Sequence, residues 1–345
     1  ENQDGQCDVP EAEPGVRYLQ AAAGGFHTVL LRSDGGILVC GDSQRGQGCV
    51  PQDEEASFAQ IAAGHAHTVL LRSDGRAVAF GCNAHGQCEV PSDAGYVQVA
   101  AGCLHTVLLH GDGRAVACGR NLYGQCQLPE RPEGYTQVSA GGQHTVLLGT
   151  DGVAVACGWN RDGQCDLPAL EAGVRYVQVA AGYAHTVLLR SDGRAVACGW
   201  NGPGQCDLPE PQAGLRYVQV AAGHAHSVLL CSDGSVVACG ESREGQCNVP
   251  VLEAGLRYCP ALPTHDLVVQ LLLEAPPRAL CVSLAGESLA TFAVPPEDLS
   301  RRVLPHVSRV LSRPGARLRV LTSEGELLAE ARTWAELFRE ASPTK

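Results

Sequence analysis

Histidine, which can bind metals and transfer protons, recurs along this chain at a nearly constant period. Six histidines each lie in a copy of Gly-x-x-His-Thr/Ser-Val-Leu-Leu, and successive copies are 40, 38, 39, 41 and 41 residues apart. One histidine per unit spreads the six around a ring that is too wide for shared metal coordination. We therefore expect no metal site. Instead, each imidazole should hydrogen-bond a neighbouring backbone group and hold the turn between two strands. These structural histidines are His27, His67, His105, His144, His185 and His226.

Cysteine follows the same period. Of the 17 cysteines, twelve form one pair per unit, and the second member usually ends a Gly-Gln-Cys motif. Metal sites normally use a tighter Cys-x2–4-Cys clip than these pairs offer. Three interpretations stay open: thiols that fill small buried apolar slots, which we favour, disulfides within each unit, and metal binding. The pairs are Cys40/Cys49, Cys82/Cys88, Cys118/Cys126, Cys157/Cys165, Cys198/Cys206 and Cys239/Cys247.

The period of about 40 residues indicates one small structural unit that stacks on its neighbours. In one such unit, the alternating run 176–182 predicts a first strand, 186–189 a second and 194–199 a third. Ser191-Asp192-Gly193 predicts a tight hairpin turn, because Asp-Gly supplies the positive φ that such turns need. Three or four antiparallel strands per unit are typical of a propeller blade. No helical stripe occurs before residue 296, which excludes helical repeats.

Three recurring motifs resemble the regulator of chromosome condensation repeat family: Ala-Ala-Gly-x-x-His-Thr, Asp-Gly-x-x-x-Ala-x-Gly and Gly-x-Asn-x-x-Gly-Gln. The short period, and the Val-Pro or Leu-Pro at the end of each unit, are most similar to the compact branch typified by the β-lactamase inhibitory propeller of soil bacteria. The resemblance covers residues 1–274 and implies an all-β, seven-bladed β-propeller. It departs from the family at the end of the third strand, where most members have tryptophan. This chain has Cys118, Cys157, Cys198 and Cys239 there.

The number of blades depends on the two ends of the repeat region. Six repeats are complete, from Arg17 to Arg257. Residues 1–10 match the tail of a repeat, and 258–274 match a head, with Thr264 in place of the repeat glycine. We expect head and tail to form a seventh blade and to close the ring through both termini, since an open ring leaves strand edges unpaired. Because the chain contains no methionine, we expect it to start after processing or to be a fragment.

The two ends of each predicted blade differ in how much they vary. The Asp-Gly turns hardly change between units, whereas the loop before each histidine and the position after each third strand do. Variation within a rigid repeat marks positions that the framework leaves free, so this loop end is the predicted binding surface. Aromatic and arginine side chains, which are typical of interface hot spots, gather there. The alternative is that the tryptophans only cap blade ends. The predicted partner-binding residues are Phe26, Arg120, Tyr123, Trp159, Tyr183 and Trp200.

Composition limits the partners. The net charge is −12, and the acidic excess lies in residues 1–274, which contain 29 Asp and Glu residues but only 15 Arg. An acidic surface repels phosphate backbones, so nucleic acid is not an expected partner. No apolar run approaches the ~18 residues that a bilayer requires, and no signal peptide is visible, so no membrane partner is expected either. We expect a monomer in the cytoplasm or nucleus.

The sequence changes character after a linker at residues 275–278. Residues 279–284 and 288–294 predict a hairpin, 296–311 a helix kinked at Pro305, and 318–328 two short strands. This β-β-α-β-β order over residues 279–340 resembles the ubiquitin-like β-grasp fold. The last strand and the terminal Gly-Gly of that fold are absent, so conjugation is not expected. A plain α+β cap packed on the propeller is the alternative.

These observations predict a non-catalytic protein-binding scaffold without a cofactor, and the ubiquitin-like resemblance suggests an adaptor in the ubiquitin pathway. The chain has no Gly-x-Ser-x-Gly, P-loop or metal-spaced cluster that would support an enzyme. One alternative is guanine-nucleotide exchange on a small GTPase, the best-known activity of the family, although the wedge used by that member has no counterpart here. The other is a fragment of a larger ubiquitin ligase, whose catalytic domain would lie elsewhere.

Overall fold

The computed structural model describes residues 2–51, 57–250 and 258, together with five strands between residues 268 and 331. The chain divides into two compact units, Glu1–Pro260 and Ala261–Lys345. Each unit is described by itself.

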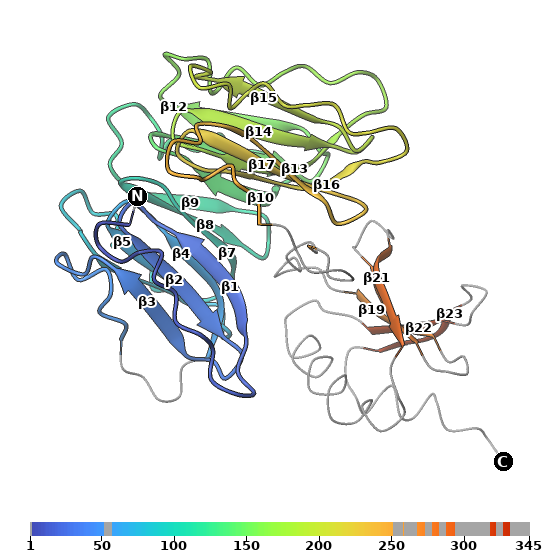
Figure 1. The fold of residues 1–345 in the computed structure, drawn as a ribbon, viewed down its shortest axis with the longest axis horizontal. Coiled ribbons are helices and arrows are strands. Elements are labelled where there is room, and N and C mark those ends of the chain that lie inside the picture. Colours follow the sequence, from blue (N-terminus) through green and yellow to red (C-terminus); the bar gives the residue numbers. More distant parts are fainter. Residues whose placement is uncertain are drawn as a thin grey trace. The chain divides into compact units, whose positions relative to one another are not determined.

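The first unit consists of six three-stranded antiparallel sheets, one for each complete repeat of the sequence (Figure 1). In every sheet the strands pair in chain order, so the second strand lies in the middle. The three strands predicted between residues 176 and 199 are confirmed. The first strands are β1 (Tyr18–Ala23), β4 (Phe58–Ala63), β7 (Tyr96–Ala101), β10 (Tyr135–Ala140), β13 (Tyr176–Ala181) and β16 (Tyr217–Ala222). The second strands are β2 (His27–Arg32), β5 (His67–Arg72), β8 (His105–His110), β11 (His144–Gly149), β14 (His185–Arg190) and β17 (His226–Cys231). The third strands are β3 (Ile37–Gly41), β6 (Ala77–Gly81), β9 (Ala115–Gly119), β12 (Ala154–Gly158), β15 (Ala195–Gly199) and β18 (Val236–Gly240).

The Asp-Gly motifs form the hairpins that join the second and third strands, as predicted. In the fifth repeat, Gly193 has a φ of +81°, a conformation that only glycine adopts without strain. The Asp192 carboxylate accepts a hydrogen bond of 3.1 Å from the backbone N–H of Arg194 and so closes the turn. The turn chemistry therefore sets where the second strand ends and the third begins.

The middle strand of each sheet is buried on both faces, which explains the uninterrupted Val-Leu-Leu in every repeat. In β8, Val107 and Leu109 pack against the following sheet, whereas Leu108 between them packs against the preceding one. Each is at most 2% exposed. Full burial of one such side chain stabilises a fold by about 1.5–3 kcal/mol. The core therefore runs as successive apolar layers between neighbouring sheets.

A glutamine in the first strand ties each sheet to the next. The Gln98 side chain accepts a hydrogen bond from the backbone N–H of Val138 (2.8 Å) and donates one to its carbonyl oxygen (3.0 Å). Its carboxamide thus bonds the neighbouring first strand as a further strand would. Equivalent bonds join Gln20 to Ile61, Gln60 to Val99, Gln137 to Val179 and Gln178 to Val220.

The second unit contains a five-stranded sheet in the order β21-β20-β19-β22-β23. Its strands are β19 (Val268–Leu272), β20 (Arg278–Val282), β21 (Ser288–Ala293), β22 (Leu318–Leu321) and β23 (Leu327–Ala331). The pairs β20/β21 and β22/β23 are antiparallel, and β19 pairs with β22 in parallel. The β19 strand lies within the segment expected to head the seventh repeat. The predicted helix 296–311 and most of the linker lie outside the described residues. In the parts of the chain that are described, no helix has the length and apolarity to cross a membrane.

Candidate protein-binding surface

The repeated histidines lie at the seams between neighbouring sheets. His144 Nε2 is 3.0 Å from the Thr186 hydroxyl of the next repeat, and that hydroxyl donates to the Gln164 carbonyl oxygen at 2.8 Å. Because the Thr186 proton is used in the bond to Gln164, the hydroxyl can only accept from His144. Nε2 therefore carries the proton and donates it to Thr186. The expected backbone partner is wrong: the histidine bonds a side chain in the adjacent repeat. The same contact joins His27 to Thr68, His67 to Thr106, His105 to Thr145 and His185 to Ser227.

Burial keeps these imidazoles neutral. It lowers the pKa of His144 and His67 to about 3, and that of His27, His105 and His185 to about 4. In all five, Nδ1 has no hydrogen-bond partner among the described residues, and burial is the largest cause that disfavours a second proton. The arrangement suits a structural bond between sheets. It does not suit proton transfer to a substrate at neutral pH.

The glycine three residues before each histidine makes room for this bond. A Cβ on Gly141 would collide with the His144 ring and with the Gly182 carbonyl oxygen of the next repeat. Glycine is therefore needed three residues before the histidine because two sheets approach closely there.

The paired cysteines are free thiols, and nine of the twelve donate hydrogen bonds to carbonyl oxygens. Cys126 Sγ lies 3.4 Å from the Arg120 carbonyl oxygen of its own repeat, and Cys118 Sγ lies 3.7 Å from the Gln87 carbonyl oxygen of the preceding one. Burial raises the pKa of Cys118 to about 12. The slots that these thiols fill are thus polar on one side, unlike the wholly apolar slots that we favoured from the sequence. Within the described part of the chain, no three His, Cys, Asp or Glu side chains meet as metal ligands would.

The two variable loops of each repeat meet at the same end of its sheet. The backbone N–H of Trp159 donates to the Gln143 carbonyl oxygen, and that of Trp200 to the Ala184 carbonyl oxygen, both at 2.8 Å. Each bond joins the position after the third strand to the residue before the repeated histidine. We call this end, over all six sheets, the loop end.

The predicted partner-binding residues fall into separate groups at the loop end. Tyr123 and Trp159, from successive repeats, touch edge to face with ring centroids 4.4 Å apart. Trp200 stands 39% exposed at the equivalent position of the following repeat. Arg120 is half-buried, and its Nε has no partner among the described residues.

The other two predicted residues contact histidines that the sequence reasoning did not single out. Tyr183 stacks on His224 at 4.3 Å between ring centroids, and Phe26 meets His65 edge to face at 4.9 Å. Both histidines occupy the first position after the repeat glycine. The only sequence signal was that imidazole replaces a small or uncharged residue there.

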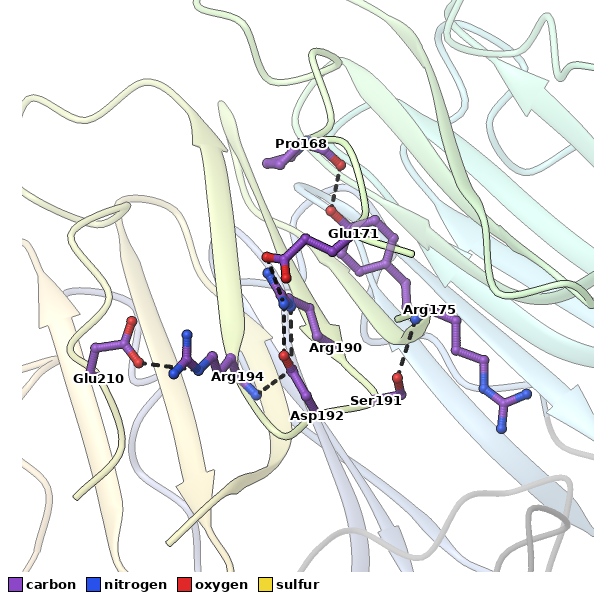
Figure 2. A network of polar contacts seen from close by, with 9 residues as sticks. Pro168, Glu171, Arg175, Arg190, Ser191, Asp192, Arg194 and Glu210 are labelled. Atoms are coloured by element: carbon purple, nitrogen blue, oxygen red, sulfur yellow. Dashed lines mark hydrogen bonds and ion pairs between the residues drawn. The ribbon is translucent and has the colours of Figure 1, made fainter. Parts of the chain in front are cut away.

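The opposite end of the sheets carries a network of framework charges (Figure 2). In the fifth repeat, Arg190 contacts Asp192 at 2.7 Å and Glu171 at 3.3 Å. Arg194 approaches Glu210 at 3.7 Å. Exposed ion pairs of this kind contribute little stability, but they occupy the side chains around the Asp-Gly turn. In the first five repeats a basic side chain contacts the turn aspartate, and in the sixth Ser235 donates to Asp233, so this end keeps one turn motif while the loop end differs.

Six successive sheets that are joined by side-chain bonds, with one buried histidine at each of the five seams, define a β-propeller of repeated blades. The chain belongs to the Regulator of chromosome condensation (RCC1) repeat family, whose model matches more than half of it. The matches cover residues 19–47, 58–87, 96–125, 135–164, 176–205 and 217–246. They lie in the first unit and give no support to a ubiquitin-like second unit. A search of curated proteins found no match.

Solved structures agree with this fold. Prp20p from Saccharomyces cerevisiae, described with its binding properties to Gsp1p and histones, is 22% identical with a TM-score of 0.59 over 68% of this chain and 74% of Prp20p. Yeast RCC1 (Prp20) bound to Kap60 is 19% identical, with a TM-score of 0.57 over 83% of this chain and 82% of that one. Human WBSCR16 is 20% identical, with a TM-score of 0.55 over 68% and 78%. At these identities the likeness shows the fold alone.

Proposed function

We propose that this protein is a non-catalytic scaffold that binds a protein partner through the loop end of its propeller. The observation that carries the proposal is the contrast between the two ends of the sheets. The loop end presents the Tyr123–Trp159 pair and the exposed Trp200, while the opposite end repeats an Asp-Gly turn whose aspartate contacts a basic side chain in the first five repeats. Large aromatic side chains that stay partly exposed on a rigid framework are typical of interface hot spots.

The position of Arg120 supports the same surface. It precedes Tyr123 by three residues, and its half-buried guanidinium has an Nε without a described partner. Because that Nε is itself buried, only the part of the guanidinium that stays exposed can meet a partner, and a charge-assisted bond of this kind is stronger than a neutral one. Fixed aromatic rings and a half-buried arginine at one end of the sheets suit recognition of a protein surface.

The expected seventh blade stays a prediction, because β19, which lies in its expected head, pairs with β20 and β22 in the five-stranded sheet. Tyr258 donates to the Pro250 carbonyl oxygen at 2.8 Å, just as Tyr217 does to Pro209, so the repeat pattern continues past the sixth sheet. Among the described residues, Thr28 and His226 show no seam bond. In the register set by Tyr258, the positions of the repeat histidine and of the following hydroxyl residue are Leu267 and Val268, so a seventh head would not supply these bonds.

A solved relative supports protein binding as the use of this fold, because yeast RCC1 (Prp20) was determined bound to Kap60. The narrower role of adaptor in the ubiquitin pathway stays a prediction that rests on residues 279–340. A monomeric state and a cytoplasmic or nuclear location also stay predictions. Exchange on a small GTPase and membership of a larger ubiquitin ligase remain the alternatives.

We expect the double variant Trp159→Ala/Trp200→Ala to lose its protein partners. Truncation of a hot-spot aromatic costs about 2 kcal/mol or more of binding free energy, so two should weaken binding at least tenfold. The measurement is affinity capture from source lysate by the full chain, with partners quantified by mass spectrometry.

The matched control is Arg76→Ala/Arg114→Ala, which removes two exposed arginines from the opposite end. It should leave the captured partners unchanged. Equal capture by wild type and the tryptophan variant, both folded by circular dichroism, would contradict the proposed surface. Capture of a small GTPase in its nucleotide-free form would favour the exchange alternative.

A further inference from the structure

Cys82 differs from the other repeat thiols in its position and its surroundings. It follows the third strand of the second sheet and occupies the place of Asp42 in the first repeat and Trp159 in the fourth. Its side chain is partly exposed at the loop end. The groups around this position decide whether its sulfur is a thiol or a thiolate.

The first repeat shows that the position accommodates a negative charge. There the Asp42 carboxylate accepts a hydrogen bond of 2.8 Å from the backbone N–H of Gln44 and one of 3.0 Å from the side-chain amide of Gln47. The two donors lie two and five residues after the acceptor. This arrangement holds an anion between one backbone and one side-chain N–H.

The second repeat presents the same donors to Cys82. The N–H of Ala84 bonds the sulfur and is the main cause that lowers the Cys82 pKa, against an opposing effect of burial. Arg45 of the preceding repeat adds a guanidinium, with Nη1 3.8 Å from Sγ. Gln87 is fully buried, its Nε2 has no hydrogen-bond partner among the described residues, and its amide also favours the thiolate. An unpartnered buried donor is thus directed at the site.

Two other thiols, Cys88 and Cys103, lie in the opposite environment. Burial raises the pKa of Cys88 and of Cys103 to about 11, so both stay protonated near neutral pH. Cys88 Sγ donates to the Cys82 carbonyl oxygen at 3.4 Å instead of competing for the donors around the Cys82 sulfur. Since the thiolate is the nucleophile, reactivity should concentrate at Cys82.

We propose that Cys82 is the reactive thiol of the propeller and a site of modification by small-molecule disulfides such as glutathione disulfide. The Cys82 thiolate attacks one sulfur of the disulfide, a new S–S bond forms at Cys82, and the second glutathione leaves as a thiolate. That leaving thiolate takes up the proton that Cys82 released. The disulfide is the only oxidant, and one disulfide bond replaces another.

The test treats the native full chain at pH 7 with limiting glutathione disulfide, stops the reaction with acid and maps adducts by peptide mass spectrometry. Cys82 should acquire glutathione about tenfold faster than Cys88 or the exposed Cys49. Arg45→Gln should slow Cys82 about threefold per unit of pKa regained, because greater intrinsic nucleophilicity partly offsets the lost thiolate. Arg161→Gln, in the loop of another repeat, should have no effect.

Two outcomes would overturn the proposal. One is that Cys49 or another thiol reacts first in the native protein. The other is that Arg45→Gln, with unchanged circular dichroism, leaves the Cys82 rate and its pH profile as in the wild type. In urea, the unfolded protein should react at Cys82 no faster than at the other thiols. That result would show that the fold, and not the local sequence, makes Cys82 reactive.

Discussion

The propeller is expected to unfold in mild acid, near pH 5, before most surface carboxylates are protonated. Burial lowers the pKa of five seam histidines from 6.5 to about 3 or 4. The unfolded chain therefore binds more protons than the folded one between those values. Stability is complete above pH 6.5 and falls as the pH decreases, because protons then favour the unfolded state.

The expected loss is large. pH 5 lies about 1.5 units below the pKa of a histidine in the unfolded chain. Protonation of the unfolded chain then lowers the unfolding free energy by about 2 kcal/mol for each histidine that stays neutral when folded. Five such groups amount to about 10 kcal/mol, similar to the ~5–15 kcal/mol net stability of a typical domain. Urea unfolding between pH 8 and 5 measures this directly. The exposed His85, replaced by glutamine, should not alter the profile. An unfolding free energy that is the same at pH 7.5 and pH 5 would contradict the neutral buried histidines.

The second large effect is expected from His144→Ala at the seam between the fourth and fifth sheets. The substitution removes a fully buried ring and the bond from Nε2 to Thr186, and it leaves a cavity between two sheets. We expect a loss of about 2–4 kcal/mol in unfolding free energy. The variant should also show a flatter pH dependence, since one of the five titrating groups is gone. Urea denaturation at pH 7.5 and pH 6 checks both results.

Thr186→Val tests the same seam from the other side. It keeps the volume but removes the hydroxyl that accepts from His144 and donates to Gln164. The double variant should lose less than the sum of the single losses, because the two side chains share one bond. Exact additivity, or a His144→Ala cost no larger than that of the exposed His85→Ala, would show that the seam bond carries no stability.

Most of the framework could be predicted from the sequence because it depends on local chemistry. Asp-Gly fixes the hairpins, and the run Val-Leu-Leu marks a strand buried on both faces. The partners across the seams could not be predicted. His144 and Thr186 are 42 residues apart, and no local pattern indicates that a histidine of one repeat bonds the hydroxyl of the next. The sequence reasoning therefore assigned the histidines to a structural role but to the wrong partner.

The sequence indicates which end of the sheets carries the candidate surface, but not which of its side chains touch. Variation between repeats placed Trp159 and Trp200 at one end, and the structure puts both there. Which rings touch depends on the loop of the neighbouring repeat, as in the contact of Tyr123 with Trp159. The same holds for Cys82, whose environment includes Arg45 from the preceding repeat. Side chains from two repeats decide the chemistry of each loop position.

The most direct test of the scaffold proposal is hydrogen–deuterium exchange of the full chain, alone and with its captured partner. The proposal predicts slower exchange on binding at residues 120–124, 159–162 and 200–203, and no change at the Asp-Gly turns of the same sheets. Protection of the Asp-Gly turns, or protection confined to residues 279–340, would contradict a partner bound at the loop end.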